Sequence, residues 1–476
     1  MIRIFELVIN RISYVDFASE YVALGIDIED CIDKRTGKIN IADDIQAVIV
    51  TKKIIQNIEE CKYHVAKQND IVLIYNGKYW LNVNHNDWSQ FTLNASMNMR
   101  KDVSLFSTVR FNKLLNQTLM MYLPRFRFLD ELSDNKVVKI NCNNGTLLIN
   151  GDGTTELIEH SPNDCFRYCL SYDYLSNDVE IPLFTRYLER ILPEIESRLL
   201  LQEMFGAILA KDIKLEFIGI FLGEGSNGKS VLHRIMMTIF GEYNVSTLSW
   251  SQLLQETSRV DLEGKLLNYS SEIDSGSLSG RADIIKILAS KEPIYIRRYY
   301  NQSYQMTDYG RILINANRMP PLMEFSHAYL RRLKLISFDQ LIEDVDAELD
   351  LSNNIIRDEI SGILNWVIIG CHRIIKNNRF TCSPKSQLTL KQYIKEQNPV
   401  SAFIEELGYE PSMDGQKIKF KSMYHEFIMF CTANKLKFVN SHEFGRHLRQ
   451  LHFEVKKGAQ NKSFVFATKV DFDQNE

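Results

Sequence analysis

The chain has 476 residues, of which 45% are hydrophobic and 24% are charged. This composition suits two to four globular domains and excludes wholesale disorder. The net charge of −4 carries no global basic excess, so a nucleic-acid-binding surface must be local. The longest apolar stretches, residues 217–222 and 362–371, fall far short of the roughly 18 residues that cross a bilayer, so we expect no membrane segment.

The eight cysteines are scattered, with no pair at two-residue spacing and no matching histidine cluster. A zinc site is therefore not expected. The N-terminal residues carry charges through what would have to be an apolar signal core. Both features indicate reduced thiols in a cytosolic or nuclear compartment, and we expect the cytoplasm, that of the host cell if the chain is phage or viral.

The first part of the chain is the least informative. Residues 1–70 carry no motif that assigns them a role. Residues 71–83 place apolar β-formers on both sides of an Asn-Gly pair, which predicts a hairpin. Further strands are expected around the turn at 143–145. A helical stretch is expected from about 182 to 209, where apolar residues recur at spacings of three and four.

Residues 223–230 read Gly-Glu-Gly-Ser-Asn-Gly-Lys-Ser. An apolar run precedes them and an amphipathic stretch follows, which is the strand–loop–helix setting of a P-loop. Such a loop curls its backbone N–H groups around phosphate oxygens. Lys229 would reach the β- and γ-phosphates, and Ser230 would place its hydroxyl on Mg²⁺. The predicted nucleotide contacts are Gly223, Glu224, Gly225, Ser226, Asn227, Gly228, Lys229, Ser230 and Val231.

Further strands follow at intervals that suit a compact ATPase core. The second buried strand, residues 265–274, contains Glu272 and Asp274 at its end. A long hairpin is expected over residues 293–306 because β-formers alternate there with polar residues. A third strand is expected over residues 311–315.

The last part of the chain forms a separate pattern. Two amphipathic helices, about 422–433 and 441–451, precede two short strands joined by a turn, which is the outline of a winged helix. Residues 411–470 hold nine Lys and two Arg against one Asp and three Glu, a local charge of +7. This excess favours nucleic acid, although a partner protein or a solvated basic face remains an alternative.

Several linked motifs resemble those of one family. Besides the P-loop, Asn317-Arg-Met-Pro320 follows a strand, and Arg331-Arg-Leu-Lys-Leu-Ile-Ser-Phe338 comes soon after. With these the chain resembles the superfamily 3 helicases, an AAA+ branch, and more closely the helicase half of the phage/plasmid and poxvirus primase-helicases. The segments at 144–147, 160–162 and 172–174 are similar to the domain that precedes the helicase in these proteins.

The resemblance covers roughly residues 70 to 476 and implies the fold class. That class is α/β, with an AAA+ P-loop ATPase core, an α+β N-terminal region and a C-terminal winged-helix domain. The expected divisions are 1–70 of unknown role, 71–205 as the preceding domain, 206–345 as the ATPase, 346–395 as a helical connector and 396–476 as the winged helix.

The resemblance also implies ATP and Mg²⁺ as ligands, and roles for further residues. Glu272 would polarise the attacking water and help to organise Mg²⁺. Related proteins often carry two adjacent acids here, and Asp274 would compensate for Ser271. Asn317 would bind the water or the γ-phosphate.

Arg331 or Arg332, with Arg332 preferred, would act as an arginine finger in the neighbouring subunit's site. Such a finger requires a ring, and the resemblance implies a hexamer.

The family places a DNA-tracking loop at the hairpin over 293–306, in the central channel of the ring. Arg297 and Arg298 would contact phosphates, with Lys291 beside them. Tyr299 or Tyr300 would stack on bases or sugars. The alternative is that these tyrosines pack on the hairpin itself or against a neighbouring subunit. His160 has no ligand constellation around it and is expected to be structural.

The implied function is ATP-dependent, ring-forming DNA unwinding during replication of a phage, virus or mobile element. The alternative is an AAA+ ATPase that loads or remodels replication proteins without processive unwinding. A P-loop kinase or nucleotide-regulated scaffold would have no reason to carry the hairpin, the Asn317 motif and the double arginine. Primer synthesis is not expected, because about 70 preceding residues are too few for a primase domain, so a separate primase or polymerase is an expected partner.

Overall fold

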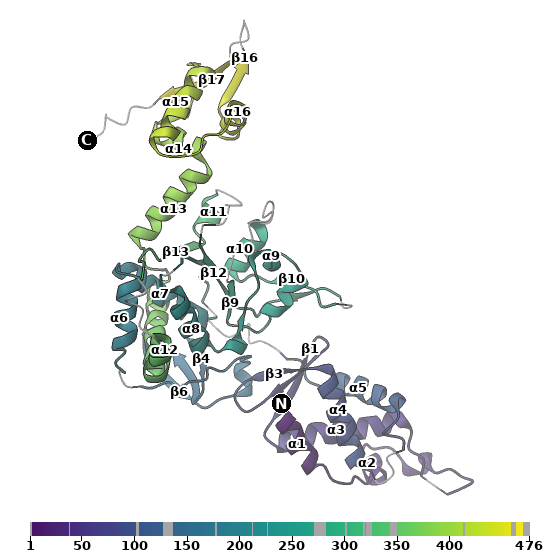
Figure 1. Cartoon of the computed structure of the whole chain (residues 1–476). Coiled ribbons are helices and arrows are strands. Elements are labelled where there is room, and N and C mark those ends of the chain that lie inside the picture. Colours follow the sequence, from purple (N-terminus) through teal and green to yellow (C-terminus); the bar gives the residue numbers. More distant parts are fainter. Residues whose placement is uncertain are drawn as a thin grey trace.

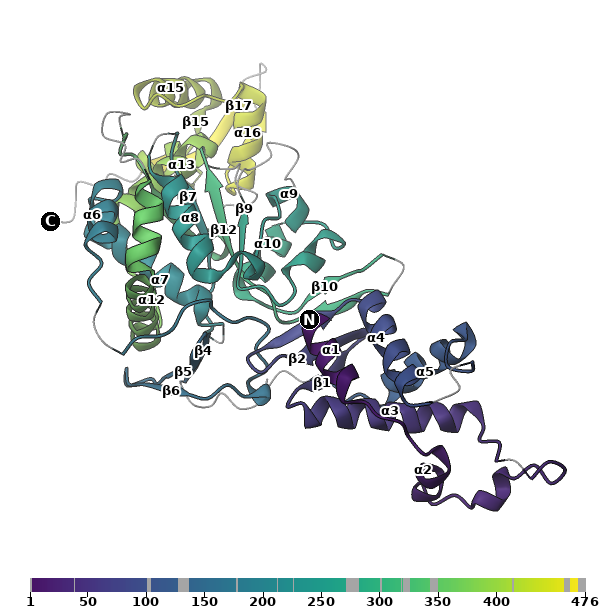
Figure 2. The same cartoon turned by 60° about the horizontal axis from the view of Figure 1, so that its bottom comes forward.

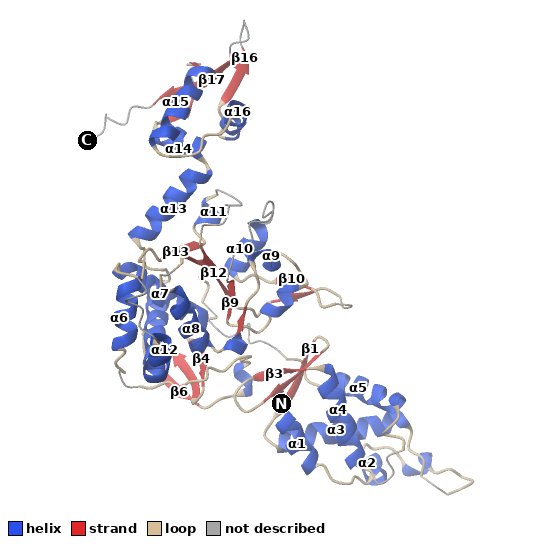
Figure 3. Ribbon diagram, in the orientation of Figure 1, coloured by secondary structure: helices blue, strands red, loops and turns tan. Residues whose placement is uncertain are grey.

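The computed structural model describes residues 2–37, 39–100, 104–126, 137–176, 179–211, 213–225, 227–270, 282–299, 302–317, 319, 326–342, 350–412, 415–457 and 463–469. A helical N-terminal domain, a central parallel sheet with its helices and a C-terminal module follow one another along an elongated molecule (Figure 1). Most of the strands lie in the middle and at the C-terminal end (Figure 3). No helix among the described residues combines the length and apolar character needed to span a bilayer.

The N-terminal domain packs helices against a small antiparallel sheet. Its helices are α1 (Ile2–Arg11), α2 (Phe17–Ala23), η1 (Ile28–Cys31), α3 (Asp43–Glu60), α4 (His85–Asn98) and α5 (Val109–Tyr122). Its strands are β1 (His64–Gln68), β2 (Ile71–Tyr75) and β3 (Trp80–Val83). The expected hairpin is confirmed, with Tyr75 opposite Trp80. One hydrophobic core runs from Phe5 to Leu123, so residues on both sides of position 70 pack together.

A second antiparallel sheet, of β4 (Val138–Cys142), β5 (Gly145–Ile149) and β6 (Thr155–Ile158), leads to η2 (Pro162–Asp164). The motif residues around it hydrogen-bond to one another. The Asn144 side chain bonds both backbone polar groups of Tyr174, each at 3.0 Å. His160 Nδ1 lies 2.9 Å from Asn141 Oδ1, and Nε2 lies 3.3 Å from the Asn143 carbonyl. His160 is therefore a structural residue, as expected.

The central sheet has five strands in the order β13-β7-β12-β9-β8, and every pairing is parallel. Its strands are β7 (Ile218–Leu222), β8 (Val245–Ser246), β9 (Leu267–Ser270), β12 (Arg311–Ala316) and β13 (Leu333–Ser337). Two hydrophobic cores flank the sheet, one on each face, as all-parallel sheets require. The antiparallel pair β10 (Ile294–Ile296) and β11 (Tyr304–Met306) extends from it as the expected hairpin.

The helices around this sheet are α6 (Pro182–Ile191), α7 (Ile195–Leu209), α8 (Lys229–Phe240), η3 (Glu242–Asn244), α9 (Trp250–Leu253), η4 (Ser258–Leu262), α10 (Ala282–Ser290), α11 (His327–Leu330) and α12 (Leu351–Asn377). The helical stretch expected over 182–209 is two helices. Pro193 lies between them, and proline cannot donate the backbone hydrogen bond that would continue a helix.

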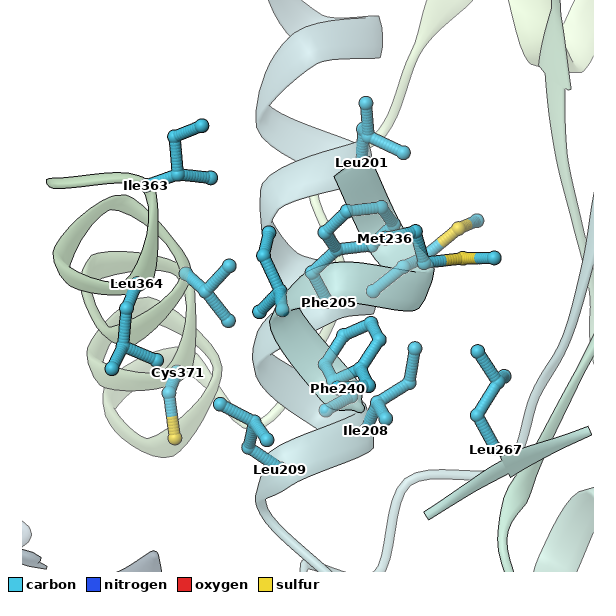
Figure 4. Packing of buried hydrophobic residues seen from close by; sticks show 14 of the residues in the cluster. Leu201, Phe205, Ile208, Leu209, Met236, Phe240, Leu267, Ile363, Leu364 and Cys371 are labelled. Carbon is cyan, nitrogen blue, oxygen red and sulfur yellow. The ribbon is translucent and has the colours of Figure 1, made fainter. Parts of the chain in front are cut away.

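Helix α12 lies in the core beside the parallel sheet although it belongs to the predicted connector. Its side chains interdigitate with those of α7 and α8 over the sheet (Figure 4). Helices α7 and α12 approach at two glycines. A Cβ on Gly206 would lie 2.4 Å from the Cys371 backbone nitrogen, and one on Gly370 would lie 2.2 Å from the Gln202 carbonyl oxygen. This close approach leaves no room for a side chain at either position.

The C-terminal module has a hydrophobic core of its own. Its elements are α14 (Pro399–Glu406), β14 (Tyr409–Pro411), β15 (Ile418–Lys419), α15 (Phe420–Ala433), α16 (Ser441–Gln450), β16 (Glu454–Lys457) and β17 (Ser463–Lys469). Two helices followed by two paired strands match the expected order.

Helix α13 (Pro384–Gln397) joins this module to the parallel sheet. At its start, Ser386 Oγ donates to the Leu335 carbonyl of β13 at 2.5 Å. At its end, Lys395 Nζ donates to Asn434 Oδ1 of the module at 2.8 Å.

Candidate nucleotide-binding site

The glycine-rich segment 223–230 begins where β7 ends and passes into α8. Because the loop follows β7 directly, it opens at the carboxyl end of the sheet. Strand β7 lies between β12 and β13, which is the place where the strand order reverses. The Gly223 N–H donates to the Ala316 carbonyl of β12 at 3.0 Å. The Phe338 N–H donates to the Leu222 carbonyl of β7 at 2.7 Å. Both neighbouring strands therefore fix the start of the loop.

Two glycines are required by the path of the loop. Gly228 has φ +82°, and a Cβ there would lie 2.7 Å from Ile191 Cγ2. A Cβ on Gly223 would lie 2.4 Å from the Asn227 side-chain nitrogen. A Cβ on Gly225, by contrast, would meet nothing within 4 Å, so the outer side of the loop has space for a ligand.

Lys229 and Ser230 open helix α8 with opposite exposures. Lys229 is buried, its Nζ donates to the Gly223 carbonyl, and burial lowers its pKa. Ser230 is exposed. A buried ammonium, an exposed hydroxyl and the N-terminus of a helix around an open glycine form a set that fits phosphate oxygens and Mg²⁺. Ser226 lies outside the described residues.

The sequence alone did not reveal what supports the loop from behind. Tyr187 of α6 donates its hydroxyl to the Gly228 carbonyl at 2.8 Å, and burial raises its pKa well above the ordinary value. The Asn227 side chain donates to the carbonyls of Glu224 at 2.6 Å and Phe338 at 3.0 Å. Tyr187 occupies an apolar helical position in the sequence pattern, which carries no hint of this contact.

Asn317 follows β12 directly and is exposed. Strand β12 runs parallel to β7 with Ala316 opposite Leu222, so Asn317 emerges at the same end of the sheet as the glycine-rich loop. Strand β9 also ends there, with Ser270 opposite Ile314 of β12. The predicted acids Glu272 and Asp274 come just after β9 in the chain and lie outside the described residues.

Arg331 and Arg332 lie at the amino end of the parallel strands, which is the end of the sheet opposite to the glycine-rich loop. They precede β13, whose first residue pairs with the first residue of β7. Both bind Glu216, at 2.7 Å from Arg331 and 3.0 Å from Arg332. The Arg331 side chain is 52% exposed, whereas that of Arg332 is 12% exposed and also bonds Ser290 Oγ. Neither arginine can therefore serve the glycine-rich loop of its own chain.

Arg331 lines a cleft of about 1260 Å³ between this end of the parallel sheet and the β4–β5 sheet. Basic side chains outnumber acidic ones there by eight to four. The basic ones are Lys139, Arg167, Lys211, Lys214, Lys291, Arg331, Lys334 and Arg379. Lys291 thus lies in this cleft, where its Nζ donates to the Lys211 carbonyl at 3.3 Å. The structure does not bring it together with the exposed end of the hairpin.

The β10–β11 hairpin projects from the sheet on the side of the N-terminal domain (Figure 2). Arg298, which follows the end of β10, is held by the buried carboxylate of Glu263, 2.7 Å away, and the Tyr304 hydroxyl donates to the same oxygen at 3.0 Å. Burial alone would lower the pKa of Arg298, but the hydrogen bonds to Tyr304 and Glu263 raise it.

Ile294, Ile296 and Met306 anchor the hairpin in the core, and three other described residues face solvent. Arg297 is exposed, Tyr299 is 78% exposed, and Tyr295, which the sequence reading passed over, is 55% exposed. Tyr300 lies outside the described residues. Of the two predicted arginines, only Arg297 is free of a structural ion pair in the described contacts.

Two family models match parts of the chain. Residues 52–193 match the model described as "D5 N terminal like", and residues 221–332 match "Family of unknown function (DUF5906)". Among curated proteins, the chain is 22% identical over 186 residues to "Putative helicase L207/L206" of Acanthamoeba polyphaga mimivirus. That alignment covers 37% of this chain and 19% of the relative, so the likeness spans about a fifth of the relative's length.

Among solved structures, the fold is similar to the A form apo structure of the NrS-1 C-terminal region. The TM-score is 0.51 at 14% identity, and the match covers 88% of this chain and 98% of that chain. The chain is thus similar in sequence, over part of its length, to the D5 N-terminal model and to a viral protein named as a putative helicase, and it shares its fold with the NrS-1 C-terminal region.

Proposed function

We propose that the chain is an ATP-driven DNA helicase of the superfamily 3 type, acting as a ring in the replication of a phage, virus or mobile element. The observation that carries the proposal is that the proposed functional residues lie at opposite ends of the strands of one parallel sheet. The P-loop and Asn317 emerge at one end, and Arg331 emerges at the other. A site divided in this way is completed by a neighbouring copy.

The loop at 223–230 is proposed to bind ATP. Its backbone N–H groups and Lys229 hold the phosphates, and Ser230 holds Mg²⁺ with help from Glu272 and Asp274. When bound there, Mg²⁺ would supply positive charge that offsets the negative charge developing on the phosphates during transfer. Asn317 orients water or the γ-phosphate, and Glu272 polarises the water. Tyr187 and Asn227 hold the loop in position from behind.

Arg331 is proposed as the arginine finger, in preference to Arg332. A finger must leave its own subunit and reach a neighbour's phosphates, which suits the more exposed of the two side chains. Heterologous contacts of this kind close into rings, and we propose a hexamer.

The hairpin is proposed to contact single-stranded DNA through Arg297 and Tyr299, joined by Tyr300. An exposed cation beside an exposed aromatic ring is the pairing that single strands favour. The C-terminal module is proposed to be a winged helix, which its helix–helix–hairpin order supports.

The deciding experiment is unwinding of a forked DNA by the purified protein, with particle mass recorded in the same buffer. We expect ATP-dependent strand displacement by a ring-sized particle, and its loss in Lys229→Ala. Lys113→Ala, an exposed lysine of α5, is the matched control and should unwind normally. DNA-stimulated ATP hydrolysis without displacement would instead indicate a loader or remodeller, and a monomer inert toward DNA would overturn the proposal.

A further inference from the structure

The sheet of the C-terminal module has one face packed on helices and one face turned away from them. Along β17, Val465 and Ala467 are buried in the module's core. Side chains alternate between the two faces of a strand, so Phe464 and Phe466 lie on the outer face. Both are only partly buried, and neither belongs to the hydrophobic core or to the residues that pack against it.

Lysines surround these two phenylalanines. Lys419 of β15 and Lys456 of β16 are the cross-strand neighbours of Phe464. Lys417 Nζ lies 5.2 Å from the centre of the Phe464 ring, and Lys456 Nζ lies 5.3 Å from that of Phe466. Glu454, opposite Phe466, pairs with Lys456 at 2.5 Å. The excess positive charge of the face therefore comes from Lys417 and Lys419, which are both exposed.

We propose that this outer face, formed by β15, β16 and β17, binds single-stranded nucleic acid, with Phe464 and Phe466 stacking on bases and the lysines contacting phosphates. Residues two apart on a strand are separated by about 7 Å, so each ring can receive its own base. Sheets that present aromatic rings beside basic side chains bind single strands in this way. The charge of +7 over residues 411–470 complements a polyanion.

The proposed face is distinct from the surface by which a helix would enter a duplex. Helix α16 carries Arg446 and Arg449, which are both exposed, and it packs on the other side of the module's core through Phe444 and Leu448. The two surfaces make different demands on the ligand. The sheet face requires unpaired bases, whereas α16 would require a groove.

The test compares the full-length chain with Phe464→Leu/Phe466→Leu for binding of oligo(dT) and of an abasic oligonucleotide of equal length. Leucine keeps an apolar side chain and removes the aromatic face. We expect the wild type to prefer oligo(dT), and the variant to bind oligo(dT) at least about five-fold more weakly per ring lost. The variant should bind the abasic strand as the wild type does. Oligo(U) in parallel distinguishes an RNA ligand from a DNA ligand.

The matched control is Lys437→Ala/Phe438→Ala, which removes an exposed lysine and a 55% exposed phenylalanine from the connection between α15 and α16. It should leave oligo(dT) binding unchanged. Both variants retain Lys229 and the β10–β11 hairpin, so ATP hydrolysis without DNA reports separately on the proposed motor. Equal binding of oligo(dT) by the wild type and the leucine variant would overturn the inference. So would a dependence on Arg446 and Arg449 with no effect of the leucines.

Discussion

Arg331 and Arg332 are adjacent in the chain and meet the same carboxylate, yet their surroundings assign them different tasks. Arg332 is largely enclosed and binds Glu216, Ser290 and the Ala328 carbonyl. Arg331 is half exposed, and both it and Glu216, which it binds, line the basic cleft. The contacts of Arg332 suit a residue that stabilises its own subunit. The exposure of Arg331 suits a side chain that can leave Glu216 and reach a neighbouring subunit.

We therefore expect Arg331→Ala to lower ATP turnover by about 10³-fold or more while the melting temperature stays near that of the wild type. Arg332→Ala should lower the free energy of unfolding by about 1–2 kcal/mol, because charged hydrogen bonds are lost. Turnover and thermal melting on both variants check this. Arg357→Ala is the control, because this exposed arginine pairs with its neighbour Asp358 and with no other acid in the described part of the chain. A turnover loss confined to Arg332→Ala would contradict the assignment.

His233 of α8 is a partly buried histidine that stacks on a strand of the central sheet. Its ring stacks on Tyr269 of β9 with the centroids 4.5 Å apart, and burial lowers its pKa below 6.5. The unfolded chain then binds more protons than the folded one below about pH 6.5, so this group's contribution to stability falls as the pH drops.

The variant His233→Phe keeps a ring for the stack and removes the proton site. We expect its melting temperature to fall less between pH 7.5 and pH 5.5 than that of the wild type. Melting curves of both proteins across this range check it, and parallel pH profiles would exclude His233 as a contributor. The other titrating groups are common to both proteins and cancel in the difference.

At the scale of elements, helix α12 packs against α7 and also holds the start of α6. The Glu359 carboxylate of α12 accepts hydrogen bonds from the N–H groups of Leu183 and Phe184, both at 2.8 Å, at the start of α6. Helix α6 in turn holds the P-loop through Tyr187. The predicted connector is thus part of the structure that shapes the site.

Gly206→Ala and Gly370→Ala should each destabilise the protein by about 1–3 kcal/mol, because the added methyl group meets backbone of the facing helix. Gly445→Ala is the control, since the nearest atoms to its Cβ would be side-chain atoms, those of the Phe420 ring at 3.3 Å and of Arg449 at 4.0 Å. There the gain in helix propensity, about 1 kcal/mol, should offset the contact. Denaturant unfolding measures all three. Equal stability of Gly206→Ala and the wild type would show that the helices can separate without cost.

Regular elements were predictable from the chain because their signals are local. The Asn-Gly hairpin and the strand–loop–helix around Lys229 follow from patterns within a few residues. The core that joins α3 to β2 and α5 was not predictable, since it depends on contacts between distant segments. The same holds for Arg298, expected at DNA and found at the carboxylate of Glu263, 35 residues away. Sequence patterns identify which groups carry charge, but they do not identify which charges are already paired.

At the scale of the whole molecule, the placement of the P-loop and Arg331 at opposite ends of the sheet predicts complementation. Lys229→Ala and Arg331→Ala should each be inactive alone, because every site lacks one of its two parts. An equal mixture that assembles at random should recover about a quarter of wild-type turnover per site, the fraction of interfaces with both parts intact. Turnover across mixing ratios checks this. An inactive mixture, with mixed rings verified by native mass, would contradict a shared site.

Helix α13 connects the parallel sheet to the C-terminal module and is attached to both. Its first turn is fastened to β13 through Ser386, and its last turn to the C-terminal module through Lys395. Fourteen residues of helix reach about 20 Å, so a tilt of about 10° at the base swings the far end by about 3.5 Å. Because β13 begins directly after Arg332, in the proposed ring a small movement of this strand at the subunit interface would be amplified by α13 into a larger displacement of the C-terminal module.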